Sequence, residues 1–213
     1  MYETGMVMYI SDIPLALRKD SAIAKDAVVA DKSMSTNSIY FNQNAMIADG
    51  TDEGAALFAN EKVRQALSMA IDREAIAEAV VYAAAATGLI PTGIFAAGNR
   101  KTTFRKACDA VYDSLKTDTT AAANLLDEAG ITPSKYTFQL SVAIYDDVHC
   151  FIAEKVVEAW TALGFNVTIK NLGTIVNNDY YRYTEDTPTD ICDDLYANEL
   201  RAGTIEAILF DYV

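Results

Sequence analysis

Apolar residues recur at helical spacing through residues 60–81, and this is the strongest pattern in the chain. Asn60 is a good N-cap, and Glu61 suits a first turn, where negative charge is favoured. Asp72 can cap a second helical stretch. The pattern therefore predicts two consecutive helices that face a core through apolar stripes, formed by Val63, Ala66, Leu67, Ala70 and Ile71 in the first and by Ile76, Ala79 and Val80 in the second.

A strand, a helix and a second strand are predicted between residues 137 and 170. Alternating apolar side chains predict strands over 137–145 and 165–170. Asp146 or Asp147 caps the intervening helix, and Gly164 ends it. This succession is typical of a right-handed crossover that joins two parallel strands. The predicted inner face of the helix is formed by Val148, Ile152, Val156, Ala159, Trp160 and Leu163.

The remaining patterns complete an α/β prediction. Residues 37–42 alternate as a half-buried strand, with Ile39 and Phe41 on one face and Ser38 and Tyr40 on the other. We expect one compact lobe with a mixed sheet flanked by helices. The other predicted segments are a short strand at 27–30, a loop at 43–59, an irregular surface segment at 99–118, a helix from 119 or 120 closed by Gly130, a polar insertion at 173–190, a helix at 191–201 and a strand at 205–212.

The charge balance excludes one class of partner. The 213 residues carry 17 Lys and Arg against 30 Asp and Glu, a formal net charge of -13. A surface that binds nucleic acid must be basic, so we expect no nucleic-acid partner. Acidity otherwise keeps a protein soluble and monomeric.

The cysteine and histidine patterns predict no metal site and no cofactor. Cys108, Cys150 and Cys192 lie far apart and form no Cys-x-x-Cys pair. The sequence does not decide whether Cys108 and Cys192 form a disulfide. His149 is the only histidine and cannot supply a multi-histidine site.

The two ends of the sequence predict a piece of a longer protein. No apolar run reaches the roughly 20 residues that a membrane-spanning helix needs. The first residues lack the basic region and cleavage site of a signal peptide. A strand-like apolar run continues to Val213, whereas a domain rarely ends inside a buried strand. We therefore expect residues 1–213 to be a single lobe, truncated at both ends.

Three sequence blocks resemble one protein family. The first is IYFN followed, after a loop, by VRQALSMAIDREAIAEAV; the second is AANLLDEAGI; the third is AEKVVEAWTALGFNVTIKNL. Together they resemble the family-5 extracellular solute-binding proteins of ABC importers, which include oligopeptide, dipeptide and nickel receptors. The segment ETGMVMYISDIP is similar to the family's start of this region, although Met8 stands where an acid is usual.

The resemblance implies the C-terminal lobe of a two-lobed receptor. The receptor would close on a peptide or related small solute by a hinge motion, and the closed form would be recognised by an ABC permease. The partners implied are that permease and the missing N-terminal lobe. The location implied is the outer face of the cytoplasmic membrane or the periplasm, for a secreted lipoprotein. The resemblance does not decide whether the ligand is an oligopeptide, a dipeptide, a nickel chelate or a sugar.

The resemblance also implies ligand contacts at three places. Met34, Ser35 and Tyr40 lie around the predicted strand; serine stands where some members have cysteine, and tyrosine where a glutamate is found. His149 falls on a position that carries histidine in oligopeptide receptors. Tyr212 matches an aromatic residue of the final strand.

His149 is also favoured by its own surroundings. It lies in the first turn of a predicted helix, just past the carboxyl end of a predicted parallel strand, where ligands gather in α/β sheets. Helix N-termini favour anionic groups, such as a peptide carboxylate. The alternative is a solvent-facing or structural histidine. Asp211 is not the family's amine-binding acid, which would align shortly after Val213.

Two other classes of function compete with the receptor. One is a hydrolytic enzyme that uses carboxylates near His149, and the other is a stand-alone interaction domain. Adjacent residues on a helix do not face one another, so His149 and Cys150 make a poor nucleophile pair and we expect no enzyme. The acidic residues Asp190, Asp193, Asp194 and Glu199 lack the spacing of an EF-hand loop.

Overall fold

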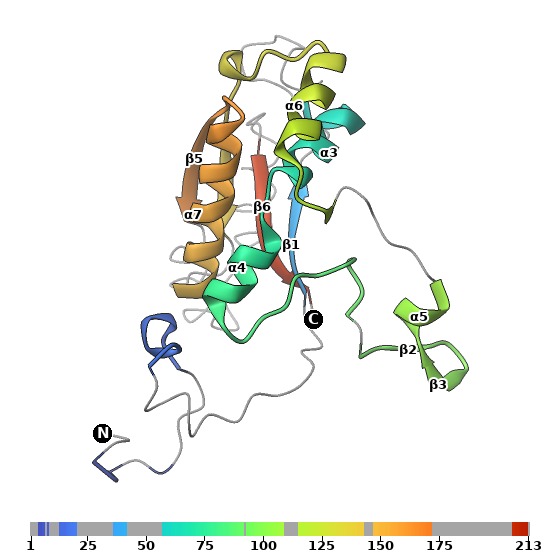
Figure 1. The fold of residues 1–213 in the computed structure, drawn as a ribbon, viewed down its shortest axis with the longest axis vertical. Coiled ribbons are helices and arrows are strands. Elements are labelled where there is room, and N and C mark those ends of the chain that lie inside the picture. Colours follow the sequence, from blue (N-terminus) through green and yellow to red (C-terminus); the bar gives the residue numbers. More distant parts are fainter. Residues whose placement is uncertain are drawn as a thin grey trace, which may run out of the picture.

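The computed structural model shows an α/β lobe with helices packed on a mixed sheet (Figure 1). The sheet contains β1 (Thr36–Phe41), β4 (Thr137–Val142), β5 (Asn166–Asn171) and β6 (Glu206–Tyr212). The structure describes residues 4–6, 8, 13–20, 36–41, 57–91, 93–108, 115–142, 147–171 and 206–212. The predicted strand at 27–30, the insertion at 173–190 and the helix at 191–201 lie outside these residues.

The strand order is β1-β6-β4-β5. β1 pairs antiparallel with β6, whereas β4 is parallel to both β5 and β6. Since β4 and β5 are joined through α7 (Asp147–Ala162), the predicted crossover between parallel strands is confirmed. The final strand lies in the interior of the sheet, between β1 and β4.

The two predicted helices of residues 60–81 are confirmed as α3 (Glu61–Met69) and α4 (Arg73–Val80). Asn60 Oδ1 accepts from the backbone N–H of Lys62 at 3.0 Å, and Asp72 Oδ1 accepts from that of Ala75 at 3.0 Å. These caps satisfy N–H groups that have no partner inside the helix. All five residues of the predicted α3 stripe are buried.

Helix α6 (Thr119–Glu128) packs on α3 and ends as predicted. Its N-cap is Asp118, whose carboxylate accepts from the backbone N–H of Ala121 at 2.8 Å. Gly130 follows with a φ of +70°, a left-handed conformation that glycine adopts without steric cost. A short 3-10 turn (η3, Pro133–Lys135) then leads into β4.

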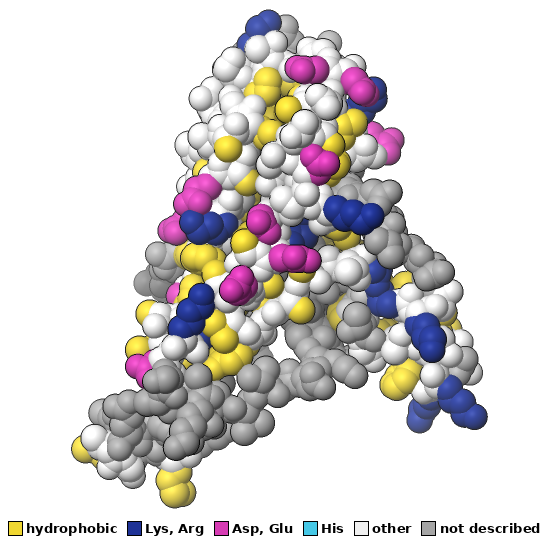
Figure 2. Space-filling model, viewed as in Figure 1, with side chains coloured by type: hydrophobic (Ala, Val, Ile, Leu, Met, Phe, Trp, Pro, Cys, Tyr) yellow, Lys and Arg dark blue, Asp and Glu magenta, His cyan; other side chains and the backbone are white. Residues whose placement is uncertain are grey.

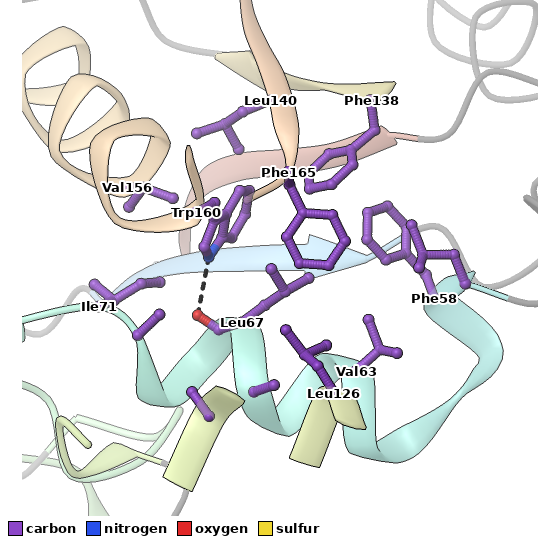
Figure 3. Close-up of a cluster of buried hydrophobic side chains, with 14 of the residues drawn as sticks. Phe58, Val63, Leu67, Ile71, Leu126, Phe138, Leu140, Val156, Trp160 and Phe165 are labelled. Atoms are coloured by element: carbon purple, nitrogen blue, oxygen red, sulfur yellow. Dashed lines mark hydrogen bonds between the residues drawn. The ribbon is translucent and has the colours of Figure 1, made fainter. Parts of the chain in front are cut away.

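An aromatic core lies between the sheet and α3 and α7 (Figure 3). Trp160 of α7 lies 5.9 Å from Phe41 and 5.7 Å from Phe138, measured between ring centroids. Its indole Nε1 donates to the backbone carbonyl of Leu67 at 2.9 Å, so the one polar atom of the ring is satisfied in a fully buried place. Ile39 and Phe41 pack against this core, which confirms the predicted alternation of β1.

Two predictions were wrong, and a third was confirmed only in part. Residues 57–59 are helical rather than loop, and Leu57 and Phe58 are fully buried. The predicted irregular segment at 99–118 contains β3 (Asn99–Thr103), which pairs with β2 (Phe95–Ala96), and the helix α5 (Phe104–Cys108). The predicted inner face of α7 is confirmed in most of its positions: Val156 and Trp160 are buried, and Ile152, Ala159 and Leu163 pack against the core. It differs at the start of the helix, where His149 is buried and Val148 is only half-buried.

Two arginines near the start of α3 and α4 bind backbone carbonyls. Arg64 Nη1 donates to the carbonyls of Phe58 at 2.7 Å and Ala59 at 2.9 Å, so it fixes the short helical segment 57–59 that precedes α3. Arg73 Nη1 donates to the carbonyl of Ser68 at 2.8 Å and, at 3.4 Å, to that of Leu115. Burial lowers the pKa of the Arg73 guanidinium.

Among the described helices, none combines the length and the apolar character that crossing a membrane requires.

Candidate functional site

Four strand ends meet at one edge of the sheet, which we call the carboxyl edge. It consists of the amino end of β1 at Thr36 and the carboxyl ends of β6 at Tyr212, β4 at Val142 and β5 at Asn171. Thr36 pairs with Tyr212, and Val142 pairs with Leu209. This is the edge at which open α/β sheets bind ligands. In Figure 1 it is the lower edge of the sheet, and α7 begins beside it.

His149 lies near the carboxyl edge, as predicted, but its side chain is buried. It occupies the first turn of α7 and is 4% exposed. Its spacing to Ala153, Val156 and Trp160 places it on the inward face of the helix. The solvent-facing alternative is therefore wrong.

An N-terminal segment also contacts the start of α7, a feature that the sequence did not reveal. The backbone N–H of Leu15, at the start of a short 3-10 helix (η1, Leu15–Leu17), donates to Asp147 Oδ2 at 2.6 Å. The contact joins residues 132 positions apart. A carboxylate in the first turn of a helix is also favoured by the helix dipole. Asp147 thus binds a second chain segment instead of serving only its own helix.

Arg18 ties the same segment to the end of α4. Its guanidinium donates to the carbonyls of Ile13 at 2.8 Å and Val80 at 3.2 Å. It also lies over the ring of Tyr82, 5.5 Å from the centroid, within the range of a cation–π contact. Through Asp147 and Arg18, the segment bridges the start of α7 and the end of α4.

Tyr40 lies away from the carboxyl edge. It pairs with Ile208, four positions along β1 from Thr36, which corresponds to roughly 13 Å at the rise of a strand. Its side chain is 41% exposed and alternates with Ile39 and Phe41, so it is on the face opposite the aromatic core. The structure therefore does not bring Tyr40 and His149 together.

The other predicted contacts are placed only in part. The Tyr212 backbone lies at the carboxyl edge, opposite Thr36, and Asp211 lies opposite Asn37. Met34 and Ser35 lie outside the described residues, as do the acidic residues 190–199. Among the residues that the structure describes, no cluster of His, Cys, Asp or Glu has the geometry of a metal site. Cys192 also lies outside, so the Cys108–Cys192 disulfide stays untested.

Comparison with known proteins gives one family and a common fold. The model of the bacterial extracellular solute-binding proteins, family 5 (middle region), matches residues 1–193. No curated protein matches the chain.

Several solved structures share the fold. Listeria monocytogenes OppA bound to peptide has a TM-score of 0.56 and 19% identity, over 92% of this chain and 33% of that one. MelB of Agrobacterium fabrum in complex with stachyose has a TM-score of 0.60 and 18% identity, over 85% and 26%. NikZ of Campylobacter jejuni in complex with Ni(L-His) has a TM-score of 0.54 and 18% identity, over 93% and 34%. The chain thus spans between a quarter and a third of the length of these proteins.

Proposed function

Because the chain belongs to the bacterial extracellular solute-binding proteins of family 5, we propose that it is one lobe of a receptor that delivers a peptide or related solute to an ABC importer. The family and the matched structures are binding proteins rather than enzymes. The observation that carries the proposal is a difference in coverage: the solved structures named above align with 85–93% of this chain, but this chain covers at most 34% of any of them. We assign the chain to the C-terminal of two lobes.

The mechanism we propose is hinge closure of two lobes on the ligand. The carboxyl edge is this lobe's contribution to the site, where the Tyr212 backbone and the start of α7 with His149 lie. Met34 and Ser35, which precede β1 in the sequence, remain candidate contacts by the family resemblance. Tyr40 contributes only if a ligand extends onto the far face of the sheet. The amino end of α7 supplies a partial positive charge that suits a carboxylate.

Peptide is the ligand class we favour, because the matched structures include OppA bound to peptide. The stachyose and Ni(L-His) complexes show that this fold also accommodates a sugar and a metal chelate. Family members are extracellular or periplasmic. For the whole protein we propose a lipid anchor at the outer face of the cytoplasmic membrane, and an ABC permease as its partner.

Titration calorimetry with a mixed peptide library tests the proposal. The 213-residue chain alone should bind weakly or not at all, since it offers one side of a two-sided site. Addition of the preceding and following segments encoded in the parent gene should restore binding. Micromolar binding by the isolated chain would contradict the two-lobe assignment.

A turnover screen separates the receptor from the enzymatic alternative. Peptides and esters are incubated with the chain and with its His149→Ala variant. We expect no hydrolysis by either protein, and hydrolysis that is abolished by the substitution would overturn the receptor assignment. A His149→Gln variant, which keeps a polar side chain of similar size, controls for loss of packing around α7.

A further inference from the structure

Helix α4 ends in a strained backbone turn. Val81, the residue after the helix, has a φ of 75° and a ψ of -48°. Among the residues that the structure describes, it is the one non-glycine residue with a positive φ. Glycine adopts a positive φ readily because it has no Cβ, whereas a β-branched side chain is sterically disfavoured there. Val81 therefore holds a conformation that its own side chain opposes.

The hydrogen bonds at this position form a γ-turn. The Tyr82 backbone N–H donates to the Val80 carbonyl at 3.0 Å, and the Val81 N–H donates to the Ala77 carbonyl at 3.0 Å as the last bond of α4. A γ-turn whose central residue has a positive φ is rare and strained. The Tyr82 hydroxyl is buried and has no hydrogen-bond partner in the described part of the chain. Two unfavourable features thus lie in adjacent residues, and such features persist only where the surrounding structure holds them.

Arg18 supplies that surrounding structure. Its Nη1 donates to the Val80 carbonyl at 3.2 Å, and its guanidinium lies 5.5 Å from the centroid of the Tyr82 ring. It therefore contacts the residues on both sides of Val81. Its Nε donates to the Ile13 carbonyl at 2.8 Å, so the guanidinium is oriented by its own segment. In Figure 1, η1 lies beside the end of α4.

The same short segment also contacts the start of α7. The Leu15 backbone N–H donates to Asp147 Oδ2 at 2.6 Å. Asp147 is the first residue of α7, one helical turn or less from His149, and this end of the helix lies beside the carboxyl edge. Residues 13–18 therefore connect the carboxyl edge physically with the strained turn.

The chain beyond the turn leads to a separate structured unit. β2 pairs with β3, and α5 contacts both strands. Arg105 Nη2 donates to Thr87 Oγ1 at 2.8 Å, which ties α5 to the chain that enters this unit. Figure 2 shows dark blue side chains of this unit at the lower right, apart from the face that the helices form. A change of backbone direction at Val81 would therefore redirect β2, β3 and α5 together.

We propose that residues 13–18 form a latch that holds the strained turn at Val81 and couples it to the start of α7. While the Arg18 contacts are in place, the turn keeps its strained form. A displacement of the start of α7 pulls on Leu15 through Asp147, loosens the Arg18 contacts and lets the turn relax. The unit of β2, β3 and α5 then changes its direction relative to the lobe. That a ligand supplies this displacement rests on the proposed function, whereas the latch itself does not.

Hydrogen exchange of the Val81 and Tyr82 backbone amides in the 213-residue chain tests the latch. In Arg18→Met both amides should exchange about tenfold faster, since a hydrogen bond from a charged donor contributes at least that factor to a local opening equilibrium. Lys19→Met removes an exposed cation from the neighbouring position and should leave both rates within about twofold. Unchanged rates in Arg18→Met, or equal increases in the two variants, would overturn the proposal. Thermal melting by circular dichroism verifies that both variants fold.

Substitutions at Val81 separate backbone strain from side-chain packing. Val81→Gly removes the steric penalty of a positive φ, so in this background Arg18→Met should accelerate exchange of the Tyr82 amide by no more than about threefold. Val81→Ala also shortens the side chain but keeps a Cβ, so the acceleration of about tenfold should remain. Equal dependence on Arg18 in the glycine and alanine backgrounds would mean that the guanidinium holds no strain, and would sink the proposal.

A third comparison tests the connection to α7. Asp147→Ala removes the acceptor of the Leu15 amide and should accelerate exchange at Val81 and Tyr82 severalfold, although the substitution lies in a different helix. Glu154→Ala removes an exposed acid from the same helix and should leave both rates unchanged. Exchange that is unaltered by Asp147→Ala, or altered equally by Glu154→Ala, would contradict the coupling. These measurements use no ligand, so the latch can fail while the receptor assignment holds, and the reverse.

Discussion

The aromatic core and the basic arm, which we define as residues 87–108 with β2, β3 and α5, differ in how far their side chains are buried. In the core, Trp160 packs against Phe41 and Phe138, and its one polar atom is bonded to the Leu67 carbonyl. In the arm, Phe95 is 56% exposed and the cations have no acid in their own segment. The first arrangement buries its aromatic rings and satisfies the indole N–H, whereas the second leaves an aromatic ring largely in solvent. Substitutions in the core should therefore lower the free energy of unfolding, whereas substitutions of exposed arm residues should leave it nearly unchanged.

The largest effect is expected at Trp160. Trp160→Ala should lower the free energy of unfolding by about 3–5 kcal/mol, because it opens a cavity beside Phe138 and leaves the buried Leu67 carbonyl without its donor. Urea denaturation measures the change. Phe95→Ala, an aromatic truncation on the arm, should stay within about 0.5 kcal/mol. Similar losses for both rings would remove the distinction between core and arm.

A smaller loss is expected at Arg73. Arg73→Met keeps much of the side-chain volume but leaves the carbonyls of Ser68 and Leu115 without this donor. We expect a loss of about 1.5–3 kcal/mol, the typical contribution of hydrogen bonds made by a charged group. Arg100→Met on the arm is the matched control and should change stability little. If Arg73→Met is neutral, the guanidinium does not hold residue 115 against the turn between α3 and α4.

The N-cap residues of α3 and α4 should have the next largest effect on the free energy of unfolding. Asn60→Ala and Asp72→Ala should each cost about 1 kcal/mol, because each removes the acceptor for one helical N–H. Asp127→Ala, near the end of α6, is the control: an acid is unfavourable at that end of a helix dipole, so its removal should be neutral or slightly stabilising. Guanidinium denaturation of the three variants in parallel gives the ranking.

The smallest effect on stability is expected at Asp147. Asp147→Asn keeps an oxygen that can accept from Leu15 but removes the charge at the start of α7, for a loss of about 0.3–1 kcal/mol. Hydrogen exchange of the Leu15 amide tests the contact itself, and Asp147→Ala should make that amide exchange faster than Asp147→Asn does. Unchanged exchange in both variants would contradict the link between this segment and α7.

Local sequence patterns correctly predicted those helices and strands whose apolar spacing or capping residues lie within the element itself. The stripe from Val63 to Ile71, the caps Asn60 and Asp72, and the alternation of β1 depend only on neighbouring residues. Leu57 and Phe58 were missed because two apolar residues in a mixed segment show no period. Their burial depends on contacts made elsewhere, including the ring of Phe41, 5.1 Å from that of Phe58.

The candidate site was predicted less well than the fold. Sequence placed His149 at the start of a helix and near the end of a strand, and both positions are confirmed. The buried orientation of its side chain was not predicted, because the apolar periodicity placed the neighbouring Val148 on the inner face of the helix. The contact between Leu15 and Asp147 spans 132 positions and has no local signature. Tyr40 and His149 were grouped by resemblance, whereas strand pairing separates them.

The interior position of β6 has a consequence for the order of folding. β1 and β4 each use β6 as a neighbour, yet β6 follows β1 by roughly 170 residues, a separation that makes closure of the pair entropically costly. During synthesis, the pair β4–β5 can form early, while β1 waits for residues 206–212 to emerge. High sequence separation slows folding. The sheet is therefore completed only when residues 206–212 are available, so loss of these few residues would leave β1 without its partner and β4 with a free edge.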